Sequence, residues 1–480
     1  MRARKRGRAT SPRHALTHDQ RLAAGSGAQP LQYVKICSLY GAGFYYMPGT
    51  DTCIKVGGFV RAEVNFNAGG SFSVFSGDFA SNANGKVDSW RSRAGVTLDT
   101  RSQTEYGTLR SYFVLASTSD NSQSGAAGGG AGAGAGNTGG SGSNPYTRLW
   151  SNAAFIQFAG FTAGKTGSFF DFDLMSYSNQ TNVWGSNLAG GGIEVFAYTA
   201  QFGNGLSASI ALENANGHRS NVLANNGAAA NSGNTGVNAV TTWVYGNQQA
   251  PDVTANLRID QAWGSAQVMG AYHQITANST GTGAGAEMSG SGWAFGGGVK
   301  FNLPMLGKGD YIQGQATWSE GATMYAGSGI NGGFALTDGH TVSLAAGANN
   351  YFTQQADAVV DNNGLDKTKA WSITGGYEHF WNTQWKTSLY GAYGKLTYSD
   401  TASNVLRPAT AGANSSASWS YWQVGSRTTW TPVTNLDLSL EGMYNHLDGA
   451  YTNPTAAGTA NFGNKSWVSG IFRVQRNFYP

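Results

Sequence analysis

The sequence has few charged residues and no long apolar run. Only 12% of its 480 residues are Asp, Glu, Lys or Arg, against about 25% in typical soluble proteins. A transmembrane helix needs about 18 or more consecutive apolar residues, and the sequence contains no such stretch. Proline is also scarce, with 10 residues. These absences exclude a helical membrane protein and a proline-rich disordered chain, and they argue against a tandem array of soluble domains.

Glycine and aromatic residues are abundant instead. The chain contains 70 glycines, and 12% of its residues are Phe, Trp or Tyr. A chain that crosses a membrane without apolar helices must form a closed β-barrel, because only helices and closed barrels pair every backbone group inside lipid. The composition alone leaves open a large secreted β-solenoid or an array of β-sandwiches.

The basic residues are concentrated at the N-terminus. Residues 1–30 contain seven Lys or Arg and one Asp, whereas the rest of the chain holds 23 bases and 25 acids, a net charge of −2. We expect residues 1–33 to lie outside the barrel, and we expect no nucleic-acid partner, because no nucleic-acid-binding module follows. An export signal has an apolar core of about 7–15 residues, which residues 1–30 lack. We therefore expect the mature chain to begin near Ala28–Tyr33.

The two cysteines of the chain, Cys37 and Cys53, flank a turn signal at Pro48–Asp51. We expect a disulfide that closes residues 34–54 into a short periplasmic segment before the first strand, since disulfides persist in oxidising compartments. A pair of free buried thiols is the alternative. No metal site is expected, because no histidine lies near either cysteine.

Alternation of apolar and polar residues predicts sixteen strands. In the first of them, Val60, Ala62 and Val64 fall on one face, and Arg61 and Glu63 fall on the other. Each segment approaches the ~10 residues that a tilted strand needs to cross a bilayer. The expected segments are 55–67, 89–101, 105–117, 148–159, 161–169, 193–202, 205–214, 253–263, 264–276, 290–302, 310–319, 369–380, 384–397, 418–431, 434–446 and 465–478.

The connections between these segments alternate between long and short. The long ones are 68–88, 118–147, 170–192, 215–252, 277–289, 320–368, 398–417 and 447–464. Long outer loops and short periplasmic turns are typical of an up-and-down barrel, whereas a solenoid repeats at a fixed period. We therefore predict an all-β, antiparallel, up-and-down transmembrane barrel of 16 strands over residues 55–480, with tryptophans near the strand ends at the membrane interfaces.

Cationic residues fall on the polar side of the strands, which faces the lumen of such a barrel. The candidate pore residues are Arg61, Arg91, Arg93, Arg110 and Arg258. A row of fixed cations creates a field that acts on passing solutes. The third long connection begins with an apolar run that contains Asp171 and Asp173. This run favours folding into the lumen opposite the arginines, although the two acids can equally cap a loop turn.

The same arginines have a second interpretation. Acidic residues lie on or beside the same strands, including Glu63, Asp99 and Glu105. Individual lumen arginines can therefore serve as structural partners of these carboxylates instead of acting on solutes.

Five stretches of the sequence resemble one family of bacterial membrane proteins. They are VKICSLYGAGFYYMPGTDTCIKVGGFVRAEVNF (Val34–Phe66), TEYGTLRSYF (Thr104–Phe113), AFIQFAGFTAGKTGSFFDF (Ala154–Phe172), AYTAQFGNG (Ala197–Gly205) and GIFRVQRNF (Gly470–Phe478). These stretches are similar to the general porins of alphaproteobacteria. The resemblance implies a homotrimeric channel in outer-membrane lipid that passes small hydrophilic solutes and ions. It also implies an inward third loop with Asp171 and Asp173 at the constriction. Members of the family typically end on Phe, whereas this chain ends on Tyr479-Pro480.

We therefore expect a passive channel, with no enzyme activity and no cofactor. A hydrolase needs a Ser–His–acid cluster, whereas the seven histidines are scattered along the chain and no serine motif accompanies them. The main alternative is a substrate-specific outer-membrane channel, for example for sugars or phosphate. A role of the long loops as an adhesin or receptor is compatible with either channel.

Overall fold

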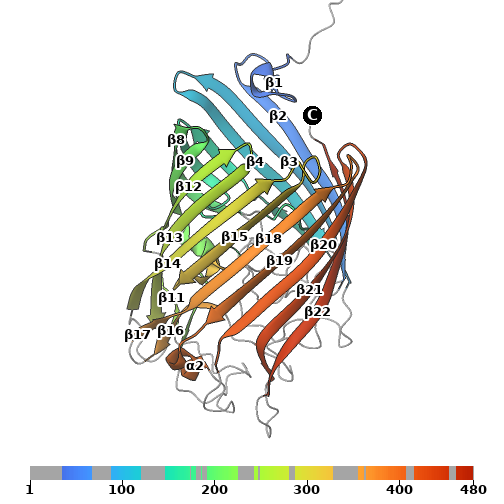
Figure 1. Ribbon diagram of the computed structural model, residues 1–480. Helices are drawn as coiled ribbons and strands as arrows, with labels where there is room; N and C mark the ends of the chain where they lie inside the picture. Colours follow the sequence, from blue (N-terminus) through green and yellow to red (C-terminus); the bar gives the residue numbers. More distant parts are fainter. Residues whose placement is uncertain are drawn as a thin grey trace, which may run out of the picture.

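A closed antiparallel barrel of 16 strands forms the body of the protein (Figure 1). The computed structural model describes residues 35–66, 88–120, 146–172, 175–179, 185, 192–224, 243–246, 249–279, 287–327, 355–361, 364–406, 416–452 and 461–478. The barrel closes where β2 (Cys53–Phe66) pairs with β22 (Asn461–Asn477), with Arg61 opposite Gln475. The predicted fold class is confirmed.

Each wall strand pairs antiparallel with the next one along the chain, as an up-and-down barrel requires. The strands between β2 and β22 are β3 (Asp88–Thr104), β4 (Gly107–Asp120), β5 (Tyr146–Trp150) with β6 (Ala154–Phe158), β7 (Phe161–Thr166), β8 (Ile193–Gly203), β9 (Leu206–Glu213), β12 (Asp252–Gln261), β13 (Gly264–Ser279), β14 (Glu287–Asn302), β15 (Tyr311–Glu320), β18 (Lys369–Phe380), β19 (Trp385–Thr397), β20 (Trp419–Val433) and β21 (Leu436–Thr452). Strands β5 and β6 together form one wall strand, because both pair with β4.

The strands are apolar on the outer face and polar on the inner face. In β18, Trp371 and Ile373 are 42% and 53% exposed, whereas Ser372 and Thr374 between them are 2% and 4% exposed. A soluble sheet shows the reverse pattern, because water favours polar residues on the exposed face. The apolar outer face therefore matches a lipid environment.

Several strand boundaries differ from the sequence-based expectation; for example, β21 ends at Thr452 instead of at residue 446. The expected strand 148–159 is interrupted at residues 151–153, which lie between β5 and β6. The expected segments 89–101 and 105–117 leave the first short turn near residues 102–104, and this placement is wrong, because β3 continues to Thr104. The Thr104 hydroxyl accepts a hydrogen bond from Tyr106 N and donates one to Gly107 O. These bonds, together with the positive φ of 108° at Gly107, place the turn two residues later.

The long connections contain small elements that the alternating pattern did not predict. They are η2 (Ala215–Gly217), β10 (Asn221–Ala224), β11 (Trp243–Tyr245), η3 (Thr323–Tyr325), β16 (Ala356–Asp361), β17 (Gly364–Lys367) and α2 (Asp400–Leu406). Strands β10, β16 and β17 form a separate sheet of three strands. Figure 1 shows β16, β17 and α2 at one end of the barrel, and β1 at the other end. Among the described residues, no helix has the length and apolar character needed to cross a membrane.

A disulfide joins the N-terminal segment to the first wall strand. Cys37 and Cys53 are bonded, with their Cα atoms 6.0 Å apart, and both are buried. Strand β1 (Tyr45–Tyr46) follows η1 (Ser38–Tyr40) and pairs with the start of β2. The guanidinium of Arg101 on β3 lies 4.9 Å from the ring centroid of Phe44. The predicted disulfide is confirmed, and β2 begins at Cys53 itself.

Replacing both cysteines by serine should lower the free energy of unfolding. Constraining a loop of this length in the unfolded chain contributes about 3 kcal/mol in the chain-entropy model. We expect the guanidinium midpoint of Cys37→Ser/Cys53→Ser in detergent micelles, followed by tryptophan fluorescence, to fall to that of the chemically reduced wild type. Ser38→Ala in the same segment is the control. An unchanged midpoint in the double variant would contradict a stabilising role for the disulfide.

Candidate functional site

The connection between β7 and β8 enters the barrel and contacts the inner face of distant strands. Its first residues bind β9 and β12. Ser168 Oγ and Phe169 N donate hydrogen bonds of 2.8 Å each to the two carboxylate oxygens of Glu213. Asn256 Nδ2 donates to Phe169 O at 2.6 Å. This third long connection is therefore anchored on the wall before it reaches Asp171.

The next residues continue along the wall over β13, β14 and β15. Gln267 Nε2 donates to the backbone oxygen of Asp171 at 3.4 Å, and Phe172 N donates to Gln315 Oε1 at 2.9 Å. A Cβ atom at Gly298 would lie 2.3 Å from the ring of Phe172. Glycine is thus required there, because the aromatic ring occupies the space that a side chain would fill.

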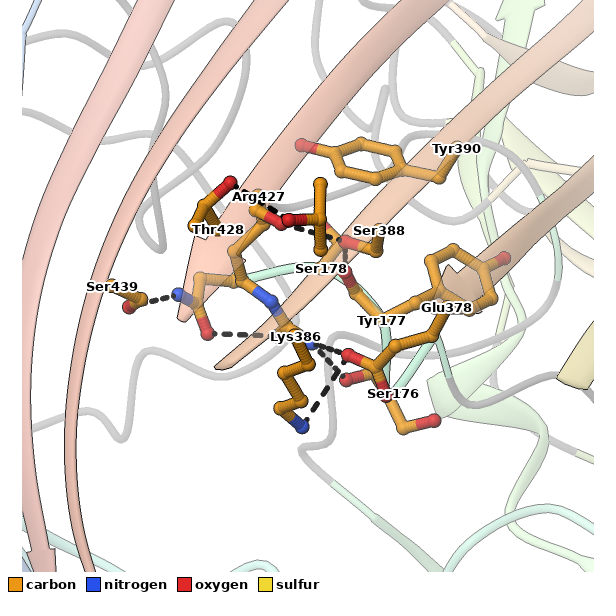
Figure 2. Close-up of polar contacts among 12 residues, drawn as sticks. Ser176, Tyr177, Ser178, Glu378, Lys386, Ser388, Tyr390, Arg427, Thr428 and Ser439 are labelled. Carbon is orange, nitrogen blue, oxygen red and sulfur yellow. Dashed lines mark hydrogen bonds and ion pairs between the residues drawn. The ribbon is translucent and has the colours of Figure 1, made fainter. Parts of the chain in front are cut away.

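The connection then reaches the strands on the far side of the lumen. Tyr177 packs on Gly376 of β18, where an added Cβ would lie 2.6 Å from the ring. Figure 2 shows Ser388 of β19 donating to Tyr177 O and Arg427 of β20 reaching the backbone of Ser176. These two bonds measure 2.6 and 2.9 Å. The aromatic ring and the backbone of the connection are both held by the wall.

The last anchors lie on β21 and β22, beside the seam of the barrel. Glu441 accepts hydrogen bonds from Ser178 Oγ at 2.7 Å and from Asn179 N at 2.9 Å, and Tyr390 also donates to it. Arg473 Nη1 donates to Asn179 Oδ1 at 2.7 Å. We name Ser168–Asn179 the inward loop. Its described residues follow the inner wall from β9 to β22.

The remaining wall, from β22 through β2 to β3, carries a cluster of arginines. Arg61 of β2 is directly opposite Arg93 of β3, and Arg61 Nε donates to Gln475 Oε1 at 2.7 Å. Like charges placed directly opposite on neighbouring strands are destabilising by roughly 0.2–1 kcal/mol. The pair of arginines therefore costs stability instead of contributing to it.

Glu63 compensates part of this charge one position further along the same face. It lies between Arg91 of β3 and Arg473 of β22 in the strand register. Arg473 Nε donates to Glu63 Oε2 at 2.7 Å, and Arg91 Nη1 lies 4.0 Å from Glu63 Oε1. The register also places Asp120 of β4 directly opposite Arg91, so two acids, Glu63 and Asp120, lie beside the four arginines of this cluster.

The other two candidate arginines pair with acids of their own wall. Arg110 donates to both oxygens of Asp99 at 3.0 Å each, and Arg101 contacts the same carboxylate. Arg258 pairs with Asp260 at 2.8 Å, and its guanidinium lies 5.3 Å from the ring centroid of Phe172. The Arg110–Asp99 pair is one of the structural partnerships that the sequence left open, with Asp99 shared between Arg101 and Arg110, whereas Asp260 was not among the expected partners.

The two predicted acids of the constriction have different outcomes. Asp171 is half-buried on the β13 side of the lumen, next to the buried Phe170. Asp173 lies outside the described residues, as do residues 1–33 and Tyr479-Pro480. The structure thus places Asp171 on the inward loop, and the arginine cluster belongs to strands β2, β3 and β22.

Sequence reasoning missed Glu213 and Glu441 as anchors of the inward loop. Both lie on the polar face of a regular strand and are 1% and 2% exposed. A buried carboxylate must be hydrogen-bonded to be tolerated, and both bind the loop. An isolated Glu on the inner face of a strand was the available signal, but its partner is far away in the sequence.

A second buried polar cluster lies near the start of the inward loop. Asp252 accepts hydrogen bonds of 2.7 Å from His273 Nδ1 and from Tyr325 Oη. His218 stacks on Tyr325 at 4.0 Å between ring centroids, and among the described residues neither of its nitrogens has a hydrogen-bond partner. Burial lowers the pKa of His218 to about 4, with a further lowering from His273, although Asp252 opposes this shift. His218 is therefore a neutral packing residue at neutral pH.

A barrel with an apolar outer face and a loop held inside its lumen defines an outer-membrane channel of bacteria. The sequence model described as "Porin subfamily" matches residues 25–471, and the chain belongs to this family. The protein therefore resides in the bacterial outer membrane.

The chain is similar to several named proteins. It is 31% identical over 268 residues to Porin Omp2b of Brucella abortus (strain 2308). The matched residues make up 53% of this chain and 63% of the relative, so the match spans less than two thirds of the relative's length. Porin Omp2b of Brucella melitensis is 30% identical over 270 residues, with the same coverage of 53% and 63%. The outer membrane channel DcaP of Acinetobacter baumannii shares the fold, with a TM-score of 0.56, 16% identity, and coverage of 90% of this chain and 99% of that chain.

Substituting Gly376 by valine should reduce the conductance of the channel. The new side chain would occupy the place of the Tyr177 ring, so the inward loop must shift away from the wall and into the lumen. We expect a lower single-channel conductance in planar bilayers with normal barrel formation.

Gly442→Val is the matched control for this substitution. Gly442 lies on the outer face between the exposed positions Leu440 and Tyr444, and an added Cβ meets nothing within 4 Å. We expect wild-type conductance from the control. A folded Gly376→Val variant with wild-type conductance would show that Tyr177 does not hold the loop.

Proposed function

We propose that the protein is a general-diffusion porin, through which small hydrophilic solutes and ions cross the outer membrane passively. The observation that carries this proposal is the position of the inward loop. Its anchors lie on the wall from β9 to β22, so the passage runs between the loop and the wall of β2 and β3. Solutes are then selected by size at the loop and by charge at the wall, with no turnover step.

The arginine cluster gives this passage its charge preference. Arg61, Arg91, Arg93 and Arg473 lie on three adjacent strands around Glu63. Fixed charges in a narrow passage with low-dielectric walls raise the local concentration of ions of opposite sign. The cluster therefore favours anions locally, and Asp171 on the inward loop contributes charge of the opposite sign. The balance between these groups sets the ion preference of the whole channel.

Removing Arg61 and Arg93 together should shift ion selectivity toward cations. The reversal potential of Arg61→Ala/Arg93→Ala in a potassium chloride gradient across a planar bilayer measures this shift. The shift should be larger near 0.1 M salt than near 1 M, because the screening length falls from about 10 Å to about 3 Å.

Arg476→Ala is the control for the loss of positive charge. Arg476 follows Gln475 on β22 but lies exposed, on the opposite face of the strand. We expect its reversal potential to equal that of the wild type. Identical reversal potentials for the wild type, the double variant and Arg476→Ala would show that the arginine cluster does not line the passage. Absence of stepwise conductance in the wild type would refute the proposed channel.

We also propose that the protein is a homotrimer that associates through the wall around β6, β7 and β8. Strand β7 has 6 residues, fewer than the ~9–11 that a strand needs to cross a bilayer, and its neighbours are β8 and the interrupted wall strand of β5 and β6. Their outer face is nevertheless apolar, with Ile156, Phe161 and Phe196 exposed. A partner subunit that covers this low wall explains both features.

A cysteine at Phe196 should cross-link subunits in outer membranes. We expect Phe196→Cys to give covalent dimers with a short bismaleimide, because the position faces the proposed interface. Ile373→Cys, on the outer face of β18, is the control and should stay monomeric on a denaturing gel. Cross-linking at Ile373 instead of Phe196 would place the interface on the other wall and contradict the proposal.

A further inference from the structure

A row of glycines crosses the outer face of the barrel on the wall that Figure 1 shows in front. Gly314 of β15 is directly opposite Gly375 of β18, which is directly opposite Gly391 of β19. The neighbouring residues Ile373 and Leu389 on the same face are 53% and 61% exposed. Three adjacent strands therefore lack side chains at the same level of the apolar surface.

The missing side chains leave a groove of about 650 Å³. Its lining is almost entirely apolar, and its larger side chains include Val299, Phe301, Ile312, Ile373 and Tyr393. The atoms that line a hollow in an apolar surface lose van der Waals contacts unless another molecule fills it. Because this part of the barrel crosses the membrane, the surrounding medium is lipid.

A second hollow, of about 430 Å³, lies on β18 and β19, nearer the short turns. It is lined by Leu306, Tyr377, His379, Trp381, Thr387, Ser388 and Leu389. Successive outward positions of β18 are Ile373, Gly375, Tyr377 and His379. The two hollows are thus consecutive stretches of one track along β18 and β19, which ends at the short-turn side of the barrel.

The short-turn end of this track is polar. Asp310 accepts hydrogen bonds from His379 Nδ1 at 2.6 Å, Tyr377 Oη at 2.7 Å and Phe380 N at 2.9 Å. Burial raises the pKa of Asp310, but these hydrogen bonds outweigh it, so that the pKa lies below its usual value. The ionised carboxylate fixes the His379 ring by accepting from Nδ1, which leaves Nε2 as a hydrogen-bond acceptor. Lys308 is exposed in the same turn.

The length of the track matches one leaflet of a bilayer. Ile373 and His379 are six residues apart on β18, which is about 20 Å along a strand. With a strand tilt of about 45°, this gives about 14 Å along the membrane normal, close to half of the ~30 Å hydrocarbon core. The track therefore extends from the periplasmic interface to about the middle of the membrane.

We propose that this track binds one phospholipid of the periplasmic leaflet. The acyl chain lies over Gly314, Gly375 and Gly391, and the headgroup phosphate lies near Lys308. A second copy of the chain fits the observations less well, because a protein interface has no reason to end at the bilayer midplane. Strands β18 and β19 have 12 and 13 residues, so this wall is tall enough to face lipid.

Filling the groove should displace the lipid. Gly297 lines the groove, and a Cβ added there has its nearest neighbour at 3.7 Å, an ordinary contact. We expect native mass spectrometry of the delipidated protein, titrated with dioleoylphosphatidylglycerol, to show one tightly bound lipid per wild-type chain and none on Gly297→Leu. Gly442→Leu, with open space on the outer face elsewhere, is the matched control and should keep the lipid.

A substitution outside the barrel wall tests the headgroup contact. Lys308→Ala lies in an exposed turn, so it leaves the strands intact, and it should weaken the same lipid about fivefold, since a basic residue near an anionic lipid contributes about 1 kcal/mol. Equal lipid binding by the wild type, Gly297→Leu and Lys308→Ala would overturn the proposal. Loss of oligomers without loss of lipid in Gly297→Leu would also overturn it, because a second copy would then occupy the groove.

Discussion

The closure of β22 on β2 is the constraint on which the rest of the structure depends. Inside lipid, an unpaired backbone N–H or C=O group costs several kcal/mol, so every strand needs a neighbour on both sides. At the seam, β2 and β22 supply these neighbours to each other, with Arg61 opposite Gln475 and Glu63 opposite Arg473. The same seam brings cations from three strands together, so barrel closure also builds the charged part of the lumen.

The inward loop and the wall are fitted to each other. Glycines of β14 and β18 leave room for Phe172 and Tyr177, and buried carboxylates of β9 and β21 accept hydrogen bonds from the loop backbone. Hydrogen bonds of this kind contribute about 0.5–1.5 kcal/mol each. The loop is therefore held at both ends, which keeps the width of the passage defined. On the opposite face, glycines of β15, β18 and β19 shape the surface toward lipid.

Much of the fold was predictable from the sequence, because period-two alternation and loop length are local signals. The barrel and its strand number followed from them, and the disulfide followed from the two cysteines that flank a turn signal. The position of the inward loop was not predictable, since Glu213 and Glu441 meet it only after the barrel has closed. The same holds for Arg110, whose pairing with Asp99 needs the register of β3 and β4. The turn at Glu105-Tyr106 was misplaced because side-chain capping by Thr104 does not alter the alternating pattern.

We propose that solutes pass the inward loop by diffusion and without a binding step. The most direct measurement is the single-channel current in planar bilayers as the solute concentration rises. For an open passage between the loop and the arginine wall, the current should increase in proportion to concentration, with no block by sugars or phosphate. A current that saturates, and that one of these solutes blocks, would contradict the claim and show a substrate-specific channel.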